Sequence, residues 1–189
     1  SSDLFSPLVK ESFKKTVEVL DLPLPRPPKF SGEVGEYKVK ILMDAKESSV
    51  GTPLSFSVQI AGQGTGVLFK DPLQNFCKDN TCKADITFLD ESKTKKFAKL
   101  KNGEYGFESE AIFRYSLFPR EKGKLNLGEL EIVFFNPNSE QYETSSSSFP
   151  EINVKDAPIF SPKAIPSISS INFKLWIFYI VISGFVGFI

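Results

Sequence analysis

The chain has 189 residues, a formal net charge of zero, 41% hydrophobic residues and 24% charged residues. This length predicts one folded domain with additional segments, and the balanced charge shows no bias toward nucleic acid or anionic lipid. The chain has no histidine, which excludes Ser-His-Asp and Cys-His catalysis, HExxH zinc sites and histidine pH switching.

The N-terminal part, residues 1–22, is predicted to be the tail of a preceding domain. Residues 1–20 lack the basic segment and apolar core of a signal peptide, so we expect the chain to begin inside a longer protein. Residues 15–22 alternate like a short strand, which we interpret as the last strand of that domain. Residues 23–29 hold four prolines, which favour a stiff polyproline II linker and hence a domain boundary.

Residues 30–155 are predicted to form a β-sandwich domain. Nineteen phenylalanines suit a strand-rich core. Residues 36–43, 54–61 and 84–89 alternate between apolar and polar side chains, as strands do. The glycine-rich residues 62–66 are interpreted as a loop between strands, because a dinucleotide fingerprint requires G-x-G-x-x-G at the start of a helix.

The predicted domain is organised around residues 111–137. Residues 111–118 and 129–135 each alternate with a period of two, and a proline and a glycine lie in the segment between them. We therefore predict an antiparallel hairpin. Neither arm is apolar on both faces throughout, which favours a second sheet covering one face. Phe113 and Tyr115, with Ile132 and Phe134 on the other arm, should be buried between the two sheets.

Cys77 and Cys82 flank a four-residue turn, so a short disulfide can form in an oxidising compartment, with two free thiols as the alternative. A zinc site with two cysteines and no histidine would need carboxylates, and the spacing of nearby oxygen ligands is not that of an EF-hand. We expect no metal and no cofactor.

Charged residues in the domain allow two readings. Lysines between residues 93 and 101 form a basic run that is typical of a solvated loop or a protected strand edge, with a basic contact patch as the alternative. Glutamates two residues apart could supply a glycosidase-like carboxylate pair, but on a strand they are more typical of a solvent face. These glutamates are Glu104, Glu108, Glu110, Glu129 and Glu131. We therefore predict no catalytic residues.

The C-terminal part is predicted to be a stalk followed by a membrane anchor. Residues 156–170 contain three prolines among serines, which is too irregular for a strand or a long helix. Residues 171–189 resemble a transmembrane helix that the end of the chain truncates, since a bilayer core requires about 20 helical residues. Its central residues are Leu175, Trp176, Ile177, Phe178, Tyr179, Ile180, Val181 and Ile182.

An ordered set of short segments carries a family resemblance. They are residues 27–35 (PPKFSGEVG), 60–64 (IAGQG), 113–123 (FRYSLFPREKG) and 133–137 (VFFNP), followed by Tyr142. Their order and spacing, over roughly residues 17–154, resemble the BatD family of bacterial oxygen-tolerance proteins. The family pattern has Ala at the position of Glu33 and Asn at that of Thr65, and the cysteine pair is not part of it.

The resemblance implies a membrane protein without catalytic residues. It implies a secretory signal upstream, tandem immunoglobulin-like domains outside the bacterial cytoplasmic membrane, and a C-terminal single-pass anchor in the lipid bilayer. It also implies association with BatA/BatB-type von Willebrand A-domain proteins and, indirectly, a MoxR-type ATPase. No nucleic acid or small-molecule substrate is expected.

Two other functions stay open at this point. An extracytoplasmic enzyme would need the glutamates to converge in a cleft. An adhesin or carbohydrate-binding β-sandwich would show an aromatic platform on an exposed face, whereas burial of all aromatic side chains would argue against it.

Overall fold

The computed structural model describes residues 16, 18–77, 82–100 and 103–157, all of them strands, turns and connecting segments without a helix. In chain order the strands are β1 (Phe30–Met43), β2 (Glu47–Ser49), β3 (Leu54–Gly64), β4 (Ala84–Lys99), β5 (Tyr105–Pro119), β6 (Gly123–Leu125), β7 (Glu129–Asn136), β8 (Gln141–Ser148) and β9 (Ile152–Lys155).

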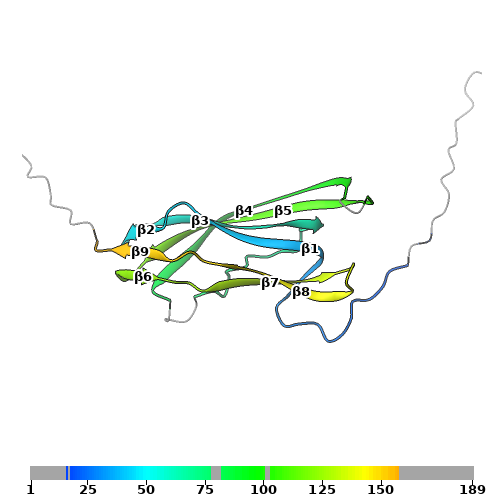
Figure 1. The fold of residues 1–189 in the computed structure, drawn as a ribbon, viewed down its shortest axis with the longest axis horizontal. Helices are drawn as coiled ribbons and strands as arrows, with labels where there is room; N and C mark the ends of the chain where they lie inside the picture. Colours follow the sequence, from blue (N-terminus) through cyan, green and yellow to red (C-terminus); the bar gives the residue numbers. More distant parts are fainter. Residues whose placement is uncertain (1–15, 17, 78–81, 101–102, 158–189) are drawn as a thin grey trace, which may run out of the picture. The chain divides into compact units, whose positions relative to one another are not determined.

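The strands are arranged as a β-sandwich. A ladder of hydrogen-bonded neighbours runs in the order β4-β5-β3-β1-β7-β8, and a smaller sheet has the order β2-β9-β6. In Figure 1, β3, β4 and β5 lie in one layer, β7 and β8 lie in the other, and β1 connects them. The all-β prediction is confirmed. The sheets are mixed rather than antiparallel throughout, however, because β1 pairs in parallel with β7 and β2 pairs in parallel with β9.

Strand β1 belongs to both layers because its partner changes along its length. Residues 30–34 pair with β7, and residues 35–43 pair antiparallel with β3. At Gly35, φ is +154°, and a Cβ atom would lie 2.0 Å from the carbonyl oxygen of Gln63. Only glycine fits so close an approach. This residue therefore allows the strand to leave one layer and join the other.

The predicted hairpin between residues 111–118 and 129–135 is wrong. The first segment lies in β5, which pairs with β3 and β4, whereas the second lies in β7, which pairs with β1 and β8. Between them, β6 pairs with β9 in the smaller sheet. Alternation identifies which face of a strand is buried, but it does not specify the neighbouring strand.

Both segments nevertheless bury the predicted faces. Phe113 and Tyr115 of β5, and Ile132 and Phe134 of β7, are all buried, which confirms that part of the prediction. Tyr37 of β1 contacts Phe134 edge-to-face, with ring centroids 5.5 Å apart. One apolar core therefore fills the space between the layers, and its packing sets the positions of the outward-facing side chains.

The serine-rich segment that follows β7 is strand β8, which the sequence pattern did not reveal. The hydroxyl oxygens of Ser145 and Ser147 accept hydrogen bonds from the backbone N–H groups of Val39 (3.0 Å) and Ile41 (3.3 Å). These N–H groups lie on the edge of β1 that faces away from β3. Because buried backbone donors need acceptors, the two hydroxyls replace the strand that is missing there.

The other predicted segments agree with the structure to different degrees. The expected strands at 36–43, 54–61 and 84–89 are present and longer, and residues 62–64 continue β3 rather than forming a loop. Residues 18–22 form no strand, and Val19 is 88% exposed. No strand within the described residues offers this segment a backbone partner, which explains why its alternation produces no pairing.

Candidate functional site

The predicted membrane anchor, Leu175 to Ile182, lies outside the described residues, as does most of the predicted stalk. Among the residues that the structure does describe, no helix is long and apolar enough to cross a membrane. The described residues of the sandwich offer loops, faces and edges as candidate functional surfaces.

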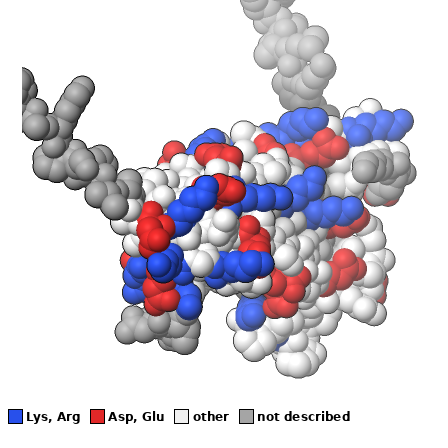
Figure 2. Space-filling view, turned by 60° about the vertical axis from the view of Figure 1, so that its left-hand side comes forward, with Lys and Arg blue, Asp and Glu red and all other residues white. Residues whose placement is uncertain are grey.

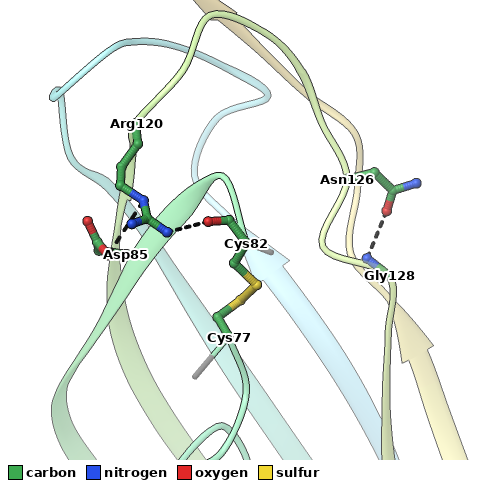
Figure 3. The surroundings of a disulfide bond; sticks show 6 residues. All are labelled: Cys77, Cys82, Asp85, Arg120, Asn126 and Gly128. Atoms are coloured by element: carbon green, nitrogen blue, oxygen red, sulfur yellow. Dashed lines mark hydrogen bonds and ion pairs between the residues drawn. A yellow bond between two sulfur atoms is a disulfide. The ribbon is translucent and has the colours of Figure 1, made fainter. Parts of the chain in front are cut away.

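The disulfide candidates lie at the end of a loop that closes one side of the core. The Cys77 and Cys82 sulfur atoms are joined at 2.10 Å, with Cα atoms 5.2 Å apart. Arg120 donates a hydrogen bond to the Cys82 carbonyl, and its Nε atom lies 3.7 Å from the carboxylate of Asp85. Figure 3 shows both contacts. The start of β4 is thus tied both to the preceding loop and to the end of β5.

The same loop makes a buried polar contact with the core. The Tyr115 hydroxyl donates a hydrogen bond of 2.6 Å to Asp71, whose carboxylate also accepts one from the backbone N–H of Leu73. Burial, and then the hydrogen bond to Asp71, raise the pKa of Tyr115 well above its usual value. Leu73 is itself buried, and Phe76 lies against Phe149 with ring centroids 5.4 Å apart. These contacts show that the loop covers one side of the apolar core.

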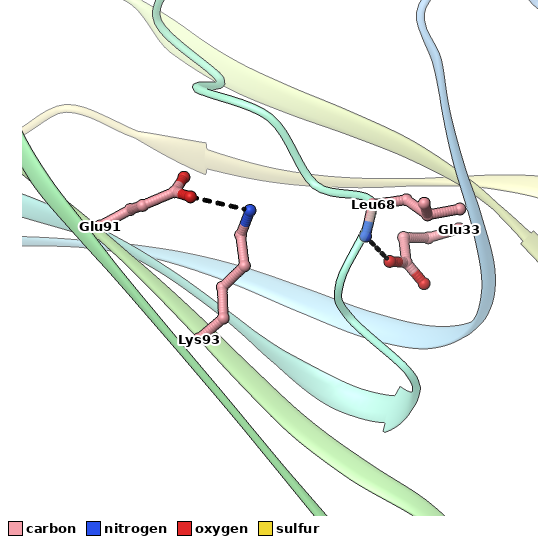
Figure 4. Close-up of polar contacts among 4 residues, drawn as sticks. All are labelled: Glu33, Leu68, Glu91 and Lys93. Atoms are coloured by element: carbon pink, nitrogen blue, oxygen red, sulfur yellow. Dashed lines mark hydrogen bonds and ion pairs between the residues drawn. The ribbon is translucent and has the colours of Figure 1, made fainter.

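Glu33 is the most buried carboxylate in the described structure, at 1% exposure. It accepts hydrogen bonds from the Tyr37 hydroxyl (3.0 Å), the Thr65 hydroxyl (3.1 Å) and the backbone N–H of Gly66 (3.1 Å). It also accepts one from the N–H of Leu68, as Figure 4 shows. Because burial and then Glu33 oppose ionisation of the phenol, the pKa of Tyr37 is raised.

The contacts of Glu33 identify its role. All its hydrogen bonds come from β1 and from the segment that follows β3, so the carboxylate fastens that segment over the core. A buried carboxylate whose oxygens already accept hydrogen bonds from the protein stabilises the fold and is not an open ligand site. In the glycine-rich residues 62–66, which could suggest a phosphate loop, the N–H of Gly66 and the hydroxyl of Thr65 are thus occupied by Glu33.

Three of the glutamates considered as a possible carboxylate pair contact other side chains. Glu110 accepts a hydrogen bond from Gln59, and Glu108 forms an ion pair with Lys96 at 2.9 Å. Glu131 forms an ion pair with Lys29 at 3.2 Å. The first two glutamates lie on β5 and the last on β7, and β3 and β1 stand between those strands.

The remaining acidic positions complete this picture. Glu129 is exposed on β7, and Glu104 lies in the turn before β5. Within the described residues, no three histidine, cysteine or carboxylate side chains are placed to hold a metal ion. On the face in Figure 2, acidic and basic side chains are interspersed rather than separated into regions of one sign.

A hollow with a volume of about 680 Å³ lies between the segment before β1, the loop that covers the core, and β7. Its charged side chains carry both signs and include Lys29, Lys70, Asp71, Glu129 and Glu131. Asp71 is engaged with Tyr115, and Glu131 is engaged with Lys29. This hollow therefore presents no set of like groups for one ligand.

A cluster of exposed aromatic side chains marks the far end of β4 and β5. Phe97 is 64% exposed, Tyr105 is 70% exposed and Phe107 is 39% exposed. The Phe97 ring stacks on Tyr105 at 6.0 Å and meets Phe107 edge-to-face at 5.4 Å. The Lys95 amino group lies over the Phe107 ring, 5.5 Å from its centroid. We call Phe97, Tyr105 and Phe107 the aromatic cluster.

The sequence analysis missed this cluster, because it recognised the basic run but not the aromatic residues beside it. Lys93, Lys95, Lys96 and Lys99 of the run lie on β4, at the edge of the ladder, as the strand-edge interpretation predicts. Lys101 lies outside the described residues. The alternation of Lys93, Lys95, Phe97 and Lys99 was a signal that could have extended the predicted strand by ten residues beyond Leu89.

Comparison with known proteins gives one clear result. A family model described as "BatD DUF11 like domain" matches residues 42–154, which is more than half of the chain. The match runs from the end of β1 to β9 and so covers most of the sandwich. No curated protein matches the chain.

Proposed function

Because the chain belongs to the BatD family, we propose that it is a membrane-anchored, extracytoplasmic protein-interaction module of a BatD-like protein. In this proposal the sandwich is an immunoglobulin-like domain on the periplasmic side of the bacterial cytoplasmic membrane, and residues 171–189 begin a single-pass transmembrane helix. The module scaffolds a complex of BatA/BatB-type von Willebrand A-domain proteins with a MoxR-type ATPase, linked to oxygen or stress tolerance.

The observation that carries this proposal is the family match over residues 42–154. The matched region covers most of the sandwich, whose outward-facing strands and edges are the surfaces that a partner could contact. Sandwiches of this kind commonly serve as extracellular or cell-surface modules. In the described residues, the carboxylates considered for catalysis are bound to neighbouring side chains or lie on separate strands.

The anchor is tested by deleting residues 167–189. The prolines of the stalk interrupt any helix that could join the sandwich to the apolar segment, so the two should not share a core. We expect the truncated protein to be soluble, with unchanged β-sheet circular dichroism and thermal midpoint, and the full chain to partition into detergent. Aggregation or early melting of the truncated protein would show that the apolar segment packs on the domain.

The partners are tested by purifying the full-length protein from its own cells in mild detergent and identifying co-purified proteins by mass spectrometry. We expect von Willebrand A-domain membrane proteins among them. An unrelated membrane protein with one transmembrane helix, expressed at the same level, is the control. Recovery of the same proteins with both baits would contradict the scaffolding role.

One observation favours a second candidate, an adhesin or carbohydrate-binding sandwich. The aromatic cluster is exposed, as sugar-stacking platforms are. Binding of neutral polysaccharides that is lost in the Phe97→Thr variant would support this candidate. Absence of polysaccharide binding would exclude it and leave the protein-interaction module.

A further inference from the structure

Strand β4 is an open edge of the ladder. It pairs with β5 along one side, from Ala84 to Lys99, and no other strand of the described residues lies on its second side. Such an edge presents a row of backbone donors and acceptors that another extended chain can use. The edge is long, and its last rungs extend beyond the point where β3 stops pairing with β5 at Glu108.

The exposed aromatic cluster continues the inner face of the sheet. In β5, Tyr105 and Phe107 have the same parity as Ala111 and Phe113, which are buried in the core. Phe97 pairs directly with Phe107 and therefore lies on the same face. The core face thus runs past the region that the opposite layer covers, and its last aromatic side chains remain exposed.

Lysines surround the aromatic cluster on that face. Lys93, Lys95 and Lys99 pair across the ladder with Ala111, Ser109 and Tyr105, so all three share the inner face. Lys93 contacts the Glu91 carboxylate at 3.2 Å, as Figure 4 shows. Among the described residues, no carboxylate lies within ion-pair distance of Lys95 or Lys99, in contrast to Lys96 on the outer face, which pairs with Glu108.

Charge argues against two occupants that this chain could supply. A second copy pairing edge to edge would bring one lysine-rich β4 against another, and like charges opposite each other destabilise a sheet. The N-terminal residues 1–15 contain three lysines and two carboxylates, and the C-terminal residues 158–189 contain two lysines and no carboxylate. Neither segment has the net negative charge that would complement Lys95 and Lys99.

The position of the cluster argues against a lipid surface. Residues 101–104, which connect β4 to β5 in the sequence, read Lys-Asn-Gly-Glu and are polar. A hairpin that enters a bilayer would present apolar side chains at its turn, and lipid offers no partners for the backbone groups of an open edge. The aromatic rings lie instead on a broad face beside the edge.

We propose that the open edge of β4 and the adjoining aromatic cluster bind an extended, acidic segment of a partner protein by strand addition. The segment pairs its backbone with residues 91–99. Its carboxylates reach Lys95 and Lys99, and the apolar side chains between them cover Phe97 and Phe107. This inference rests on the proposed function as a protein-interaction module and assigns the surface and the chemistry of the partner.

The test uses the full chain in detergent micelles and the fluorescent ten-residue peptide Thr-Glu-Thr-Val-Thr-Glu-Thr-Val-Thr-Glu, in which glutamate and valine alternate on one face of the strand. The same peptide with lysine in place of each glutamate is the control ligand. We expect the acidic peptide to bind, the basic peptide not to bind, and amide hydrogen exchange to slow in β4. Failure of the acidic peptide to bind, or equal binding of both peptides, would overturn the proposal.

Matched charge reversals locate the surface. Lys95→Glu with Lys99→Glu should weaken binding of the acidic peptide by about tenfold or more. Lys38→Glu with Lys40→Glu makes the same change of net charge on β1, an interior strand of the ladder, and should change binding less than about twofold. Equal losses in the two double variants would show that net charge alone attracts the peptide.

Two further arms separate this inference from its alternatives. The first arm measures binding of the full chain to vesicles of anionic phospholipid. If the vesicles bind more strongly than the acidic peptide does, and Lys95→Glu with Lys99→Glu weakens both interactions equally, the surface binds a membrane instead. Co-purification of von Willebrand A-domain proteins that is unaffected by that double variant would refute this surface while leaving the proposed function intact. Loss of co-purification only in that variant would support both.

Discussion

The two ends of strand β5 have the same alternating pattern but differ in the burial of their side chains. From Ala111 to Leu117, every second side chain is buried under the opposite layer, whereas Tyr105 and Phe107, on the same face, are exposed. The difference lies in what covers them. At the buried end, β7 and the loop closed by Cys77 and Cys82 lie over the face; at the other end, the described structure leaves the aromatic side chains uncovered.

This difference shows that the orientation of a side chain and its burial have separate causes, although one sequence pattern reflects both. Alternation fixes the orientation of each side chain relative to the sheet, whereas burial depends on a second layer that is distant in the sequence. Exposed aromatic side chains that continue a core face are a feature that folding alone does not require. The buried end should therefore determine the stability of the domain, and the exposed end should be available for binding.

The sharpest test of this comparison is Phe113→Ala. Its side chain is fully buried, so the truncation should lower the free energy of unfolding by about 3–5 kcal/mol through lost burial and a residual cavity. Urea denaturation followed by circular dichroism measures the change. An unaltered midpoint would mean that the buried and exposed faces are assigned the wrong way round.

A smaller effect is expected at the loop that covers the buried end. Replacing both Cys77 and Cys82 by serine should lower the free energy of unfolding by about 2 kcal/mol, because a loop this short restricts few unfolded conformations. Before that measurement, the non-reduced protein should have a mass two hydrogen atoms below that of the reduced chain. Two thiols that react with an alkylating agent, in protein from an oxidising compartment, would contradict the disulfide.

Alkaline pH should also lower the free energy of unfolding, through the buried phenol of Tyr115. The raised pKa of Tyr115 means that its stabilising contribution is fully present below about pH 10, where the unfolded-state phenol ionises, and is lost as the pH rises above that value. From pH 10 to pH 11, the free energy of unfolding should fall by about 1 kcal/mol more in the parent than in Tyr115→Phe. Parallel denaturation curves for the two proteins across this range would contradict the coupling.

The smallest effect is predicted at the exposed end. Phe97→Thr introduces threonine, which also suits strands, and removes an aromatic side chain that is mostly exposed. Its free energy of unfolding should stay within about 0.5 kcal/mol of the parent value. A loss comparable to that of Phe113→Ala, measured in the same denaturant series, would show that this end belongs to the core.

Much of the strand content was predictable from sequence, because the core strands alternate over long stretches. Residues 36–43 and 54–61 were assigned correctly, and the burial of Phe113 and Phe134 followed from parity alone. Strand pairing was not predictable. β1 changes partner at Gly35, and its parallel contact with β7 joins segments about a hundred residues apart, for which no local signal exists.

The polar parts of the structure were hidden for a different reason. The serines of β8 lack the apolar alternation that identifies a strand, and their role depends on N–H groups of β1 that only the folded chain brings near. The contact of Glu33 with Leu68 likewise joins residues that have no pattern in common. The aromatic cluster was visible as residues but not as a surface, because its exposure depends on where the opposite layer ends.

The passage of β1 between the layers also has a mechanical consequence. The chain enters the sandwich at Phe30 and leaves after Lys155 near the opposite end of its long axis (Figure 1). Tension transmitted along the polypeptide would therefore pull β1 lengthwise past both β3 and β7. The hydrogen bonds on its two sides would be loaded in shear and resist together, instead of opening one after another as in a zipper. This strand arrangement should therefore resist a stretching force that is applied between the two ends of the domain.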